Sequence, residues 1–386
     1  MPMYDFIIVG LGTAGSATCM TLARRGFRVL GIDKHRPPHA MGSHHGGSRS
    51  VRRAYLEGTA YVPMALKSWE LWQKLERDSG RQLLVETGNL TIGAPDSPAV
   101  AGFMASAQAY DIPHAVLSAS EVRIKWPQMF LPDTFVAGLE KAAGIVFPEL
   151  CIKTFLSEAE KAGADLVYDE PVIRWSEDHG HVRVNTACSA YDGGRVLISA
   201  GAWTNRLLDF PGNPLQPKRV PVHWIEVPED PSLHLGHFPV SFWQVPDHER
   251  LEDPKNHTEF YILPVIGPSS QMKIAFHNKL ANCDPMTLDR TVFRDEVDGI
   301  KNMIERFLPG FHHRPIRSEV CMYTVTSDGH FYLGKRPGSE NVYGVALAGH
   351  GFKFAAVLGE ILADLMTDIS PEVDTKMFSP DRFGLG

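Results

Sequence analysis

The first apolar segment of the chain is short and continuous. Residues 6–9 are all apolar, which is typical of a strand buried on both faces, as parallel strands are. Residues 16–25 then predict a helix, and residues 27–32 predict a second strand. A strand, a helix and another strand in close succession predict a β-α-β unit at the start of the chain.

The same patterns predict helices and strands along the rest of the chain. Between residues 61 and 78, apolar side chains such as Leu66, Trp69 and Leu75 recur at near-helical spacing, which predicts a helix. Further helices are predicted over residues 99–110, 121–126, 149–163, 296–307 and 354–366. Strands are predicted over residues 83–92, as a pair within 136–147, and over 165–168, 172–176, 182–186, 195–199, 220–227, 260–265, 272–278 and 342–347.

Three glycines stand between the first strand and the first helix. Gly10, Gly12 and Gly15 fit G-x-G-x-x-G, in which the glycines serve a tight turn, close approach of a pyrophosphate, and close packing of helix and strand. The N-terminus of such a helix offers free N–H groups to phosphates. Asp33 ends the second strand, where a carboxylate can bind the ribose hydroxyls of an unphosphorylated adenosine. The pattern predicts an ADP-containing dinucleotide, and a tight turn in an unrelated α/β protein is the alternative.

The fingerprint occurs once, which bears on the cofactor and on the domains. An enzyme holding FAD and NAD(P)H on two Rossmann domains would need two fingerprints, so we predict FAD alone. Helix–strand alternation occurs at the start, middle and end of the chain, with strand-rich segments between. The predicted fold class is a mixture of α/β and α+β, with a Rossmann-type FAD-binding domain interleaved with an antiparallel-sheet substrate domain. We predict the FAD-binding domain over residues 1–82, 145–217 and 330–386, and the substrate domain over 83–144 and 218–329.

Composition and charge restrict the possible partners. The chain has 386 residues, of which 44% are hydrophobic, enough for two domains with sizeable cores. Its net charge of −7, from 38 basic and 45 acidic side chains, argues against a nucleic acid as the main partner. No apolar run approaches the length of a membrane span, and the first strand leaves no room for a signal peptide. The 5 cysteines include no C-x-x-C motif, which argues against a disulfide framework and predicts a cytoplasmic protein.

Two arginines in the loop after Asp33 are candidates for binding an anion. Arg49 and Arg52 would lie on one side of a helical turn and would suit a carboxylate or the electron-rich edge of a flavin. Two solvated arginines in a basic loop are the alternative. The adjacent His44 and His45 have no cysteine or carboxylate at ligand spacing, so we do not expect a metal site.

Four further segments complete a resemblance to a known family. They read GSHHGGSRSVR over residues 42–52, YILP and KIAFH over 261–264 and 273–277, CMYT over 321–324, and AGHGFKF over 348–354. With the fingerprint, they occur in order within residues 4–370. The chain thereby resembles the monomeric sarcosine oxidases and N-methyl-tryptophan oxidases, within the D-amino-acid-oxidase-like flavoproteins.

The resemblance implies roles for individual residues. Arg49 would lie against the flavin ring, while Arg52 and Lys353 would bind the substrate carboxylate. Cys321 would carry FAD as a thioether on the 8α-methyl group, although a free cysteine is by default a buried apolar residue. Further FAD contacts are implied at Thr13, Ala14, Lys34, Ser43, Ser48, Val172, Ala200, Gly201, Trp203, Met322, Gly349, Gly351, Phe352 and Lys353.

Three residues of the strand-rich region complete the implied site. Lys273 would speed the reaction of reduced flavin with O2, because a cation stabilises the charge of superoxide. His277 would lie on the same strand face as Lys273, and both His277 and Tyr261 would line the substrate pocket. The alternatives are that Lys273 lies on a solvated strand face and that His277 and Tyr261 have ordinary packing positions.

The favoured function is oxidation of a secondary N-methyl amino acid by a monomeric enzyme, with a small amine and O2 as its partners. The products would be formaldehyde, the demethylated amino acid and H2O2. A cyclic imino acid such as pipecolate, or a fructosyl amino acid, is the alternative substrate, and a dehydrogenase with a partner electron acceptor is a third interpretation. Residues 327–334 and 47–48 differ from the family pattern and leave the substrate open. Trp224, Phe242 and Trp243 would either line an aromatic-accepting pocket or belong to the core.

Overall fold

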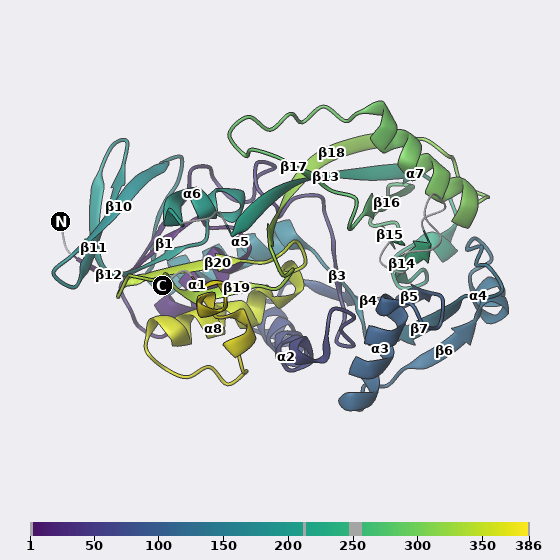
Figure 1. Ribbon diagram of the computed structural model, residues 1–386, viewed down its shortest axis with the longest axis horizontal. Coiled ribbons are helices and arrows are strands. Elements are labelled where there is room, and N and C mark those ends of the chain that lie inside the picture. Colours follow the sequence, from purple (N-terminus) through teal and green to yellow (C-terminus); the bar gives the residue numbers. More distant parts are fainter. Residues whose placement is uncertain (1–2, 211–213, 247–256, 385–386) are drawn as a thin grey trace.

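The computed structural model describes residues 3–210, 214–246 and 257–384. The molecule is elongated and has two halves, each built on one large sheet (Figure 1). The strands and helices from the beginning and the end of the chain lie together in the same half (Figure 1). In the part of the chain that is described, no helix is long and apolar enough to span a membrane.

The first half contains an eight-stranded sheet with parallel strands at its centre. β1 lies between β12 and β2, and both neighbours run parallel to it. The order is β10-β11-β12-β1-β2-β9, and β20 pairs with both β12 and β19. The strands are β1 (Tyr4–Val9), β2 (Val29–Ile32), β9 (Asp165–Val167), β10 (Val172–Asp178), β11 (His181–Thr186), β12 (Ala190–Ile198), β19 (Tyr332–Lys335) and β20 (Val342–Ala346).

The central strand of this sheet is buried on both faces, which confirms the expectation from its continuous apolar run. Phe6 and Ile8 pack in one core with helices α1, α5 and α8. Ile7 and Val9 pack on the opposite face, with the β10–β12 meander and α6. The helices of this half are α1 (Thr13–Arg24), α2 (Val62–Ser79), α5 (Pro148–Lys161), α6 (Thr204–Leu208) and α8 (Ala355–Met366).

The second half contains a nine-stranded, mostly antiparallel sheet, in the order β17-β13-β16-β15-β14-β5-β7-β6 with β18 beside β13. Helix α7 packs on this sheet, where Phe307 lies 5.6 Å from Phe260 between ring centroids. The strands are β5 (Asn89–Gly93), β6 (Ala115–Ser118), β7 (Val136–Glu140), β13 (Leu215–Glu226), β14 (Val240–Pro246), β15 (His257–Leu263), β16 (Gln271–Phe276), β17 (Ala281–Asn282) and β18 (Pro315–Thr326). The helices are α3 (Pro98–Ala109), α4 (Ala119–Lys125) and α7 (Arg294–Phe307).

A third, small sheet corrects two expectations. It consists of β3 (Arg49–Val51), β8 (Gly144–Val146) and β4 (Leu84–Glu86). The single strand predicted over residues 83–92 is two strands, β4 and β5, that belong to different sheets. The chain turns between them at Gly88, which has a φ of +75° that favours glycine. The helical turn expected to carry Arg49 and Arg52 is also wrong, because Arg49 begins strand β3 and pairs with Val146.

The two large sheets are assembled from alternating stretches of the chain. The eight-stranded sheet takes strands from residues 4–32, 165–198 and 332–346, and the nine-stranded sheet takes strands from the stretches between. This interleaving is the arrangement predicted from the sequence. The particular domain boundaries stay a proposal.

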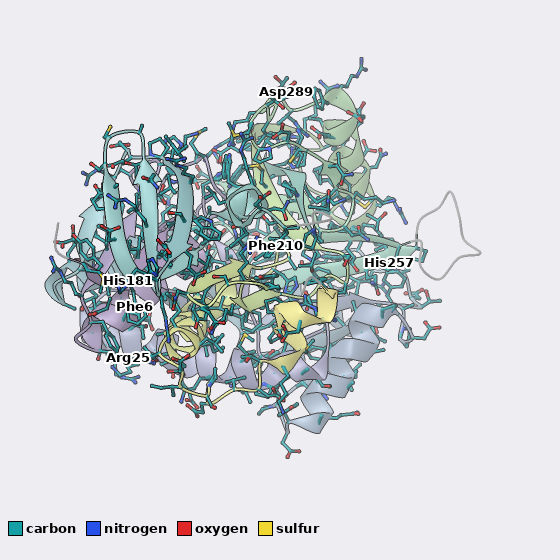
Figure 2. All side chains as sticks on the ribbon, turned by 60° about the vertical axis from the view of Figure 1, so that its left-hand side comes forward. Phe6, Arg25, His181, Phe210, His257 and Asp289 are labelled. Carbon is teal, nitrogen blue, oxygen red and sulfur yellow. The ribbon has the colours of Figure 1, made fainter. Side chains whose placement is uncertain are left out.

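Helices α1 and α8 pack closely side by side on one face of the eight-stranded sheet. A Cβ atom added at Gly359 would lie 2.8 Å from the backbone oxygen of Ala17, so the two helices approach at a position that only glycine fits. Just beyond the end of α1, Arg25 forms ion pairs with Glu360 at 2.6 Å and with Asp364 at 2.7 Å, both on α8 (Figure 2 labels Arg25).

We predict that Gly359→Ala lowers the free energy of unfolding by about 1–3 kcal/mol, because the added methyl group must push α8 away from the α1 backbone. Gly310→Ala is the matched control, since a Cβ atom at Gly310 meets no atom within 4 Å. Urea unfolding of both variants, followed by circular dichroism, measures the difference. Equal stability of the two variants would contradict the prediction.

Candidate active site

A cavity of about 530 Å³ lies between the two halves of the molecule. Val9, Ile32 and Ala346 line it from the carboxyl ends of the parallel strands, where open α/β sheets bind ligands. Phe242 and Tyr261 line it from the antiparallel sheet. This volume is within the usual range for small-molecule sites. The carboxyl edge of the parallel sheet lines one part of the cavity, and the antiparallel sheet lines another.

The fingerprint glycines line or support one end of this cavity. A Cβ atom at Gly10 would lie 2.6 Å from the Ser199 backbone oxygen, and one at Gly15 would lie 1.9 Å from the Gly10 oxygen. The nearest atom to a Cβ at Gly12, by contrast, would be a ring atom of His44 at 3.4 Å, an ordinary contact. Packing within the protein therefore requires glycine at positions 10 and 15, while position 12 leaves its backbone open to a ligand. This is the division of roles expected for a dinucleotide site.

Asp33 lies at the same end of the cavity, as predicted. Its carboxylate accepts hydrogen bonds from the backbone N–H of Leu11 at 2.6 Å and of His35 at 2.9 Å. These bonds fix the carboxylate beside the glycine turn. The side chain is buried by the protein but lines the cavity, so a ribose could reach it.

Arg49 lines the cavity and fastens the loop that precedes it. Its guanidinium donates hydrogen bonds of 2.8 Å to the backbone oxygens of Ser43, His45 and Ser48. Three charge-assisted bonds from one side chain hold this loop in place. The alternative of a solvated arginine does not describe Arg49.

Arg52 and Lys353 come together in the cavity, as predicted, and both are buried. Arg52 Nη2 lies 3.3 Å from both carboxylate oxygens of Glu57. Lys353 Nζ donates to the backbone oxygen of His350 at 2.7 Å and lies 3.3 Å from the Tyr55 hydroxyl. Glu57 thus contacts Arg52 directly, and its charge also acts on Lys353.

The charges of this cluster shift each other's pKa values. Burial would raise the pKa of Glu57, but Arg52, His350 and Lys353 outweigh it and hold the value at about 2. Burial, with the charge of Arg52, lowers the pKa of Lys353 to about 7. With Lys353 protonated the cluster has an excess positive charge, which suits one further anion.

Sequence reasoning missed Glu57, Tyr55 and His350 as members of this cluster. Tyr55 Oη and His350 Nδ1 are 2.6 Å apart, and burial lowers the pKa of His350 to about 3, so this histidine is neutral. A carboxylate five residues after Arg52 was the signal available for Glu57, and it is a weak one.

Lys273 is buried, which excludes the alternative of a lysine on a solvated face. Its Nζ donates to the backbone oxygens of Gly46 at 3.0 Å and Ser48 at 2.9 Å. Burial, with the charge of Arg49, lowers the pKa of the Lys273 ammonium well below its ordinary value.

His277 follows the end of β16 and lines the cavity, as Tyr261 does. Burial lowers the pKa of His277 and raises that of Tyr261 to about 12, so both are neutral near pH 7. His277 packs edge-on against Phe242, with ring centroids 5.6 Å apart. Of the other aromatic candidates, Trp243 belongs to the core of the second half, while Trp224 is buried beside Lys273 and Arg317.

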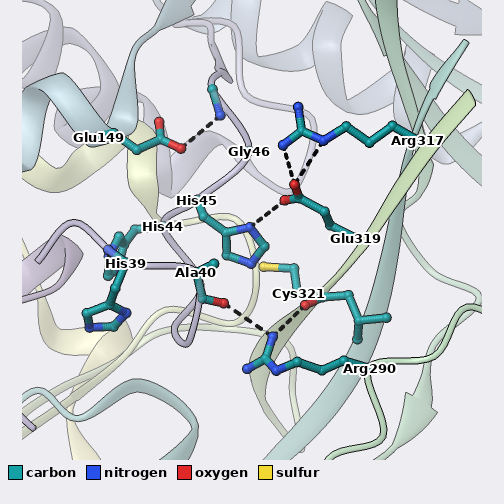
Figure 3. Close-up of polar contacts among 12 residues, drawn as sticks. His39, Ala40, His44, His45, Gly46, Glu149, Arg290, Arg317, Glu319 and Cys321 are labelled. Carbon is teal, nitrogen blue, oxygen red and sulfur yellow. Dashed lines mark hydrogen bonds and ion pairs between the residues drawn. The ribbon is translucent and has the colours of Figure 1, made fainter. Parts of the chain in front are cut away.

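Cys321 is buried on β18 beside His45 (Figure 3). His45 Nδ1 lies 3.0 Å from Glu319 Oε2, also on β18. The sequence has neither residue at ligand spacing from the two histidines, but the fold brings a carboxylate and a cysteine to His45 from the distant strand β18. No group of three or more potential ligands able to hold a metal occurs among the described residues.

Most residues predicted to contact FAD or substrate line the cavity. Gly15, Lys273 and Cys321 are not among the lining residues: Gly15 lies in α1, and Lys273 and Cys321 are buried on β16 and β18. The predicted residues that line it are Gly10, Gly12, Thr13, Ala14, Asp33, Lys34, Ser43, Ser48, Arg49, Arg52, Val172, Ala200, Gly201, Trp203, Tyr261, His277, Met322, Gly349, Gly351, Phe352 and Lys353.

A dinucleotide cradle joined to a cationic pocket suits an oxidoreductase that binds a dinucleotide cofactor beside an anionic substrate. The family described as FAD dependent oxidoreductase matches residues 5–365, and the chain belongs to this family. It is 38% identical to the monomeric sarcosine oxidase of Streptomyces avermitilis over 99% of this chain and 98% of that protein. It is 33% identical to the N-methyl-L-tryptophan oxidase of Citrobacter koseri over 98% of this chain and 99% of that protein.

Solved structures of other amino acid oxidoreductases share the fold. The open form of NikD, an unusual amino acid oxidase of nikkomycin biosynthesis, superposes with a TM-score of 0.85 at 22% identity, covering 98% of both chains. The L-proline dehydrogenase from P. horikoshii superposes with a TM-score of 0.82 at 19% identity, covering 100% of this chain and 99% of that one. At these identities, the likeness establishes the fold.

We predict that the flavin-loaded protein binds a simple carboxylate, such as acetate, about tenfold more weakly at pH 9 than at pH 6, a difference of about 1.4 kcal/mol. The reason is that Lys353, with a pKa of about 7, loses its proton as the pH rises and then attracts an anion less. Glu57 and His350, at about 2 and 3, do not titrate in this range. Titration followed by the flavin absorption spectrum gives the dissociation constants.

Lys353→Arg is the matched control, because it keeps the positive charge at every pH of the experiment. Its affinity for acetate is expected to change little between pH 6 and pH 9. A wild-type affinity that is equally flat would show that Lys353 does not bind the anion.

Proposed function

We propose that this chain is an oxidase of a secondary N-methyl amino acid, such as sarcosine or a compound like N-methyltryptophan, with O2 as the electron acceptor. The observation that carries the proposal is the pair of buried cations, Arg52 and Lys353, which line the same cavity as the dinucleotide fingerprint. An amino acid carboxylate is an anion of the right size for them. The names of the two sequence relatives support an N-methyl substituent.

The residues present fit FAD. The open backbone at Gly12 suits the pyrophosphate and the fixed Asp33 carboxylate suits the adenosine ribose, while the turn at Ala200 and Gly201 offers a wall with little side chain. When bound, FAD accepts two electrons from the amine and delivers them to O2. Arg49 would lie against the flavin ring from the loop that it fastens.

The other residues would bind and orient the substrate. Arg52 and Lys353 would hold the carboxylate, with Arg52 exchanging part of its contact with Glu57 for the substrate. Tyr261 and His277 are neutral and would form the wall near the amine. Oxidation of the N-methyl carbon yields an imine, which water hydrolyses to formaldehyde and the demethylated amino acid.

Lys273 would assist the reduction of O2. Because burial keeps the pKa of this lysine low, negative charge developing nearby favours its protonated form, which in turn stabilises that charge. Its two hydrogen bonds to backbone oxygens fix the position of Nζ.

We also propose that Cys321 binds FAD covalently, through a thioether to the 8α-methyl carbon. Support comes from its neighbours, because Met322 lines the cavity and both His45 and Arg49 lower the pKa of the thiol. The carbon–sulfur bond replaces the thiol proton and one methyl proton, and the two electrons released go to O2, which the oxidase reaction already uses. A monomeric state and a cytoplasmic location stay predictions.

We predict that Arg52→Ala raises KM for an N-methyl amino acid by roughly 10- to 150-fold, because the variant loses one hydrogen-bonded contact between charged groups. The assay measures H2O2 and formaldehyde from the same sample of wild-type and variant enzyme. Arg53→Ala is the control, because Arg53 pairs with Glu140 and is absent from the cavity lining.

The products separate the candidate functions. Peroxide without formaldehyde, from a cyclic imino acid or a fructosyl amino acid, would overturn the N-methyl substrate. Slow reoxidation of the reduced enzyme by O2 would favour a dehydrogenase with a partner acceptor. An unchanged KM in Arg52→Ala would remove Arg52 from the carboxylate site.

We predict that acid denaturation leaves the yellow flavin attached to the wild-type polypeptide and releases it from Cys321→Ser, since a serine oxygen forms no thioether. Cys151→Ser is the control, because Cys151 is also buried but lies on α5. Flavin fluorescence on a denaturing gel gives the result. Free FAD from the wild type would contradict the attachment.

A further inference from the structure

Trp224 is a buried aromatic residue that is not among the residues lining the cavity. It lies on β13, directly opposite Lys273 on β16 and directly opposite Arg317 on β18. At this position β13 lies between β16 and β18, and opposed residues of neighbouring strands point to the same face of a sheet. The register therefore places one cation on each side of the indole.

The two cations differ in their surroundings. Lys273 Nζ lies over the Trp224 ring at 5.8 Å from the centroid, and the central guanidinium carbon of Arg317 lies 4.4 Å from it. The side chain of Arg317 is 53% exposed and pairs with Glu319 (Figure 3), whereas Lys273 is buried. An aromatic face attracts a cation more strongly where water is excluded, so Lys273 is the contact that gains more from the ring.

Gly46 closes the space around the two side chains. Lys273 Nζ donates to the backbone oxygens of Gly46 at 3.0 Å and of Ser48 at 2.9 Å. A Cβ atom at Gly46 would lie 3.3 Å from Nζ and 3.7 Å from the outer edge of the Trp224 ring, and its φ of +100° favours glycine. The loop thus lies directly on both side chains, and Nζ is held by two carbonyl oxygens beside an aromatic face.

We propose that Trp224 is a positioning residue whose aromatic face holds Lys273 in its ammonium form beside the cavity, where the ammonium assists the reduction of O2. This inference rests on the role proposed for Lys273. Ser48, which accepts one of the hydrogen bonds of Nζ, lines the cavity, so the lysine lies directly behind its wall. Trp224 transfers neither electrons nor protons; two electrons from the reduced flavin and two protons convert O2 to H2O2.

The other charges near Lys273 leave its ammonium form in need of such support. Burial, with the charge of Arg49, lowers the pKa of Lys273, and the opposing effects of Cys321, Glu149 and Glu319 do not restore it. The direct polar contacts of Nζ are neutral carbonyl oxygens. Because the face of an aromatic ring is negative, the indole favours the charged lysine.

The first measurement detects the pair in the full chain prepared without flavin. The absorption band of an indole shifts when a charge beside it appears or disappears, so the titration of Lys273 should be visible in the spectrum of Trp224. Subtracting the Trp224→Phe spectrum isolates this residue from the other tryptophans. We expect a pH-dependent step that Lys273→Met abolishes. A titration without this step would overturn the proposal.

The second measurement uses rapid mixing of the flavin-loaded protein to separate its two half-reactions. We expect Trp224→Leu to slow reoxidation by O2 about three- to tenfold, the size of one cation–π contact, and to leave reduction by the amine unchanged. Trp224→Phe keeps an aromatic face and should retain most of the rate. A merely structural role would slow both half-reactions, and that result would overturn the proposal.

The pH dependence of reoxidation gives the sign of the effect. Reoxidation assisted by the ammonium declines as the pH rises through the pKa of Lys273, and loss of the aromatic face lowers that pKa. Trp224→Leu should therefore move the midpoint down by roughly 0.5–1 pH unit. An unchanged or higher midpoint would mean that the ring only excludes water or fills space, and would overturn the proposal.

Arg317→Gln is the matched control, because it keeps the indole and removes the cation on its other side. Loss of this like charge should leave the midpoint unchanged or raise it, the opposite direction to Trp224→Leu. A general disturbance of this face of the sheet would instead slow reoxidation in both variants. That outcome would also contradict the proposed role of Trp224.

Lys273→Met distinguishes failure of this inference from failure of the proposed function. If Lys273→Met reoxidises as fast as the wild type, the proposed role of Lys273 is wrong, and the inference about Trp224 fails with it. If Lys273→Met is slow but Trp224→Leu is as fast as the wild type, the inference alone fails. In the double variant, Trp224→Leu should cause no further loss, because both residues act through one ammonium. Additive losses would show that Trp224 acts by another route.

Discussion

The site depends on how the loop between β2 and β3 satisfies its backbone oxygens. This loop runs between the two halves without regular secondary structure, and unpaired buried carbonyls would cost about 1–3 kcal/mol each. Three cations from outside the loop supply the donors: Arg49 from β3, Lys273 from β16, and Arg290 from the segment before α7. The oxygens they bind belong to Ala40, Met41, Ser43, His45, Gly46 and Ser48. The loop is thereby fixed to both halves of the molecule.

Two other cations, Arg52 and Lys353, make the cavity suitable for an anion. Concentrating positive charge in a buried space is costly, and the structure limits this cost in two ways. Glu57 balances Arg52 with a carboxylate that stays ionised, and Lys353 has a pKa low enough to give up its proton. A bound carboxylate would favour the protonated lysine, so binding and protonation support each other. The Arg52–Glu57 contact of 3.3 Å is long for such a pair and leaves the guanidinium available.

Local patterns allowed much of the fold to be predicted, and long-range contacts explain what was missed. The β1–α1–β2 unit and α7 were predicted within about three residues, because their apolar periodicity and glycines are local signals. The strand at Arg49 was missed because its partner, Val146, is far along the chain. The contact between His45 and Glu319 was missed for the same reason, whereas Glu57 was missed because a carboxylate five residues after Arg52 is a weak local signal. His45 and Glu319 are separated by 274 residues, and nothing near either residue in the sequence indicates the other.

The cavity combines a pair of cations with an apolar wall from the second half, and this explains why the fold alone does not identify the substrate. In the proposed function, Arg52 and Lys353 would bind the carboxylate, which every amino acid substrate offers, and so they would contribute little to the choice among substrates. That choice would depend on the apolar residues of the second half, such as Phe242 and Leu263, which line the cavity from neighbouring strands. The Arg52 guanidinium also lies over the face of the Phe242 ring, 5.4 Å from the ring centroid. A substitution of Phe242 would therefore alter both the space for the amine and the position of Arg52. Substrate choice and carboxylate binding would be coupled in this way.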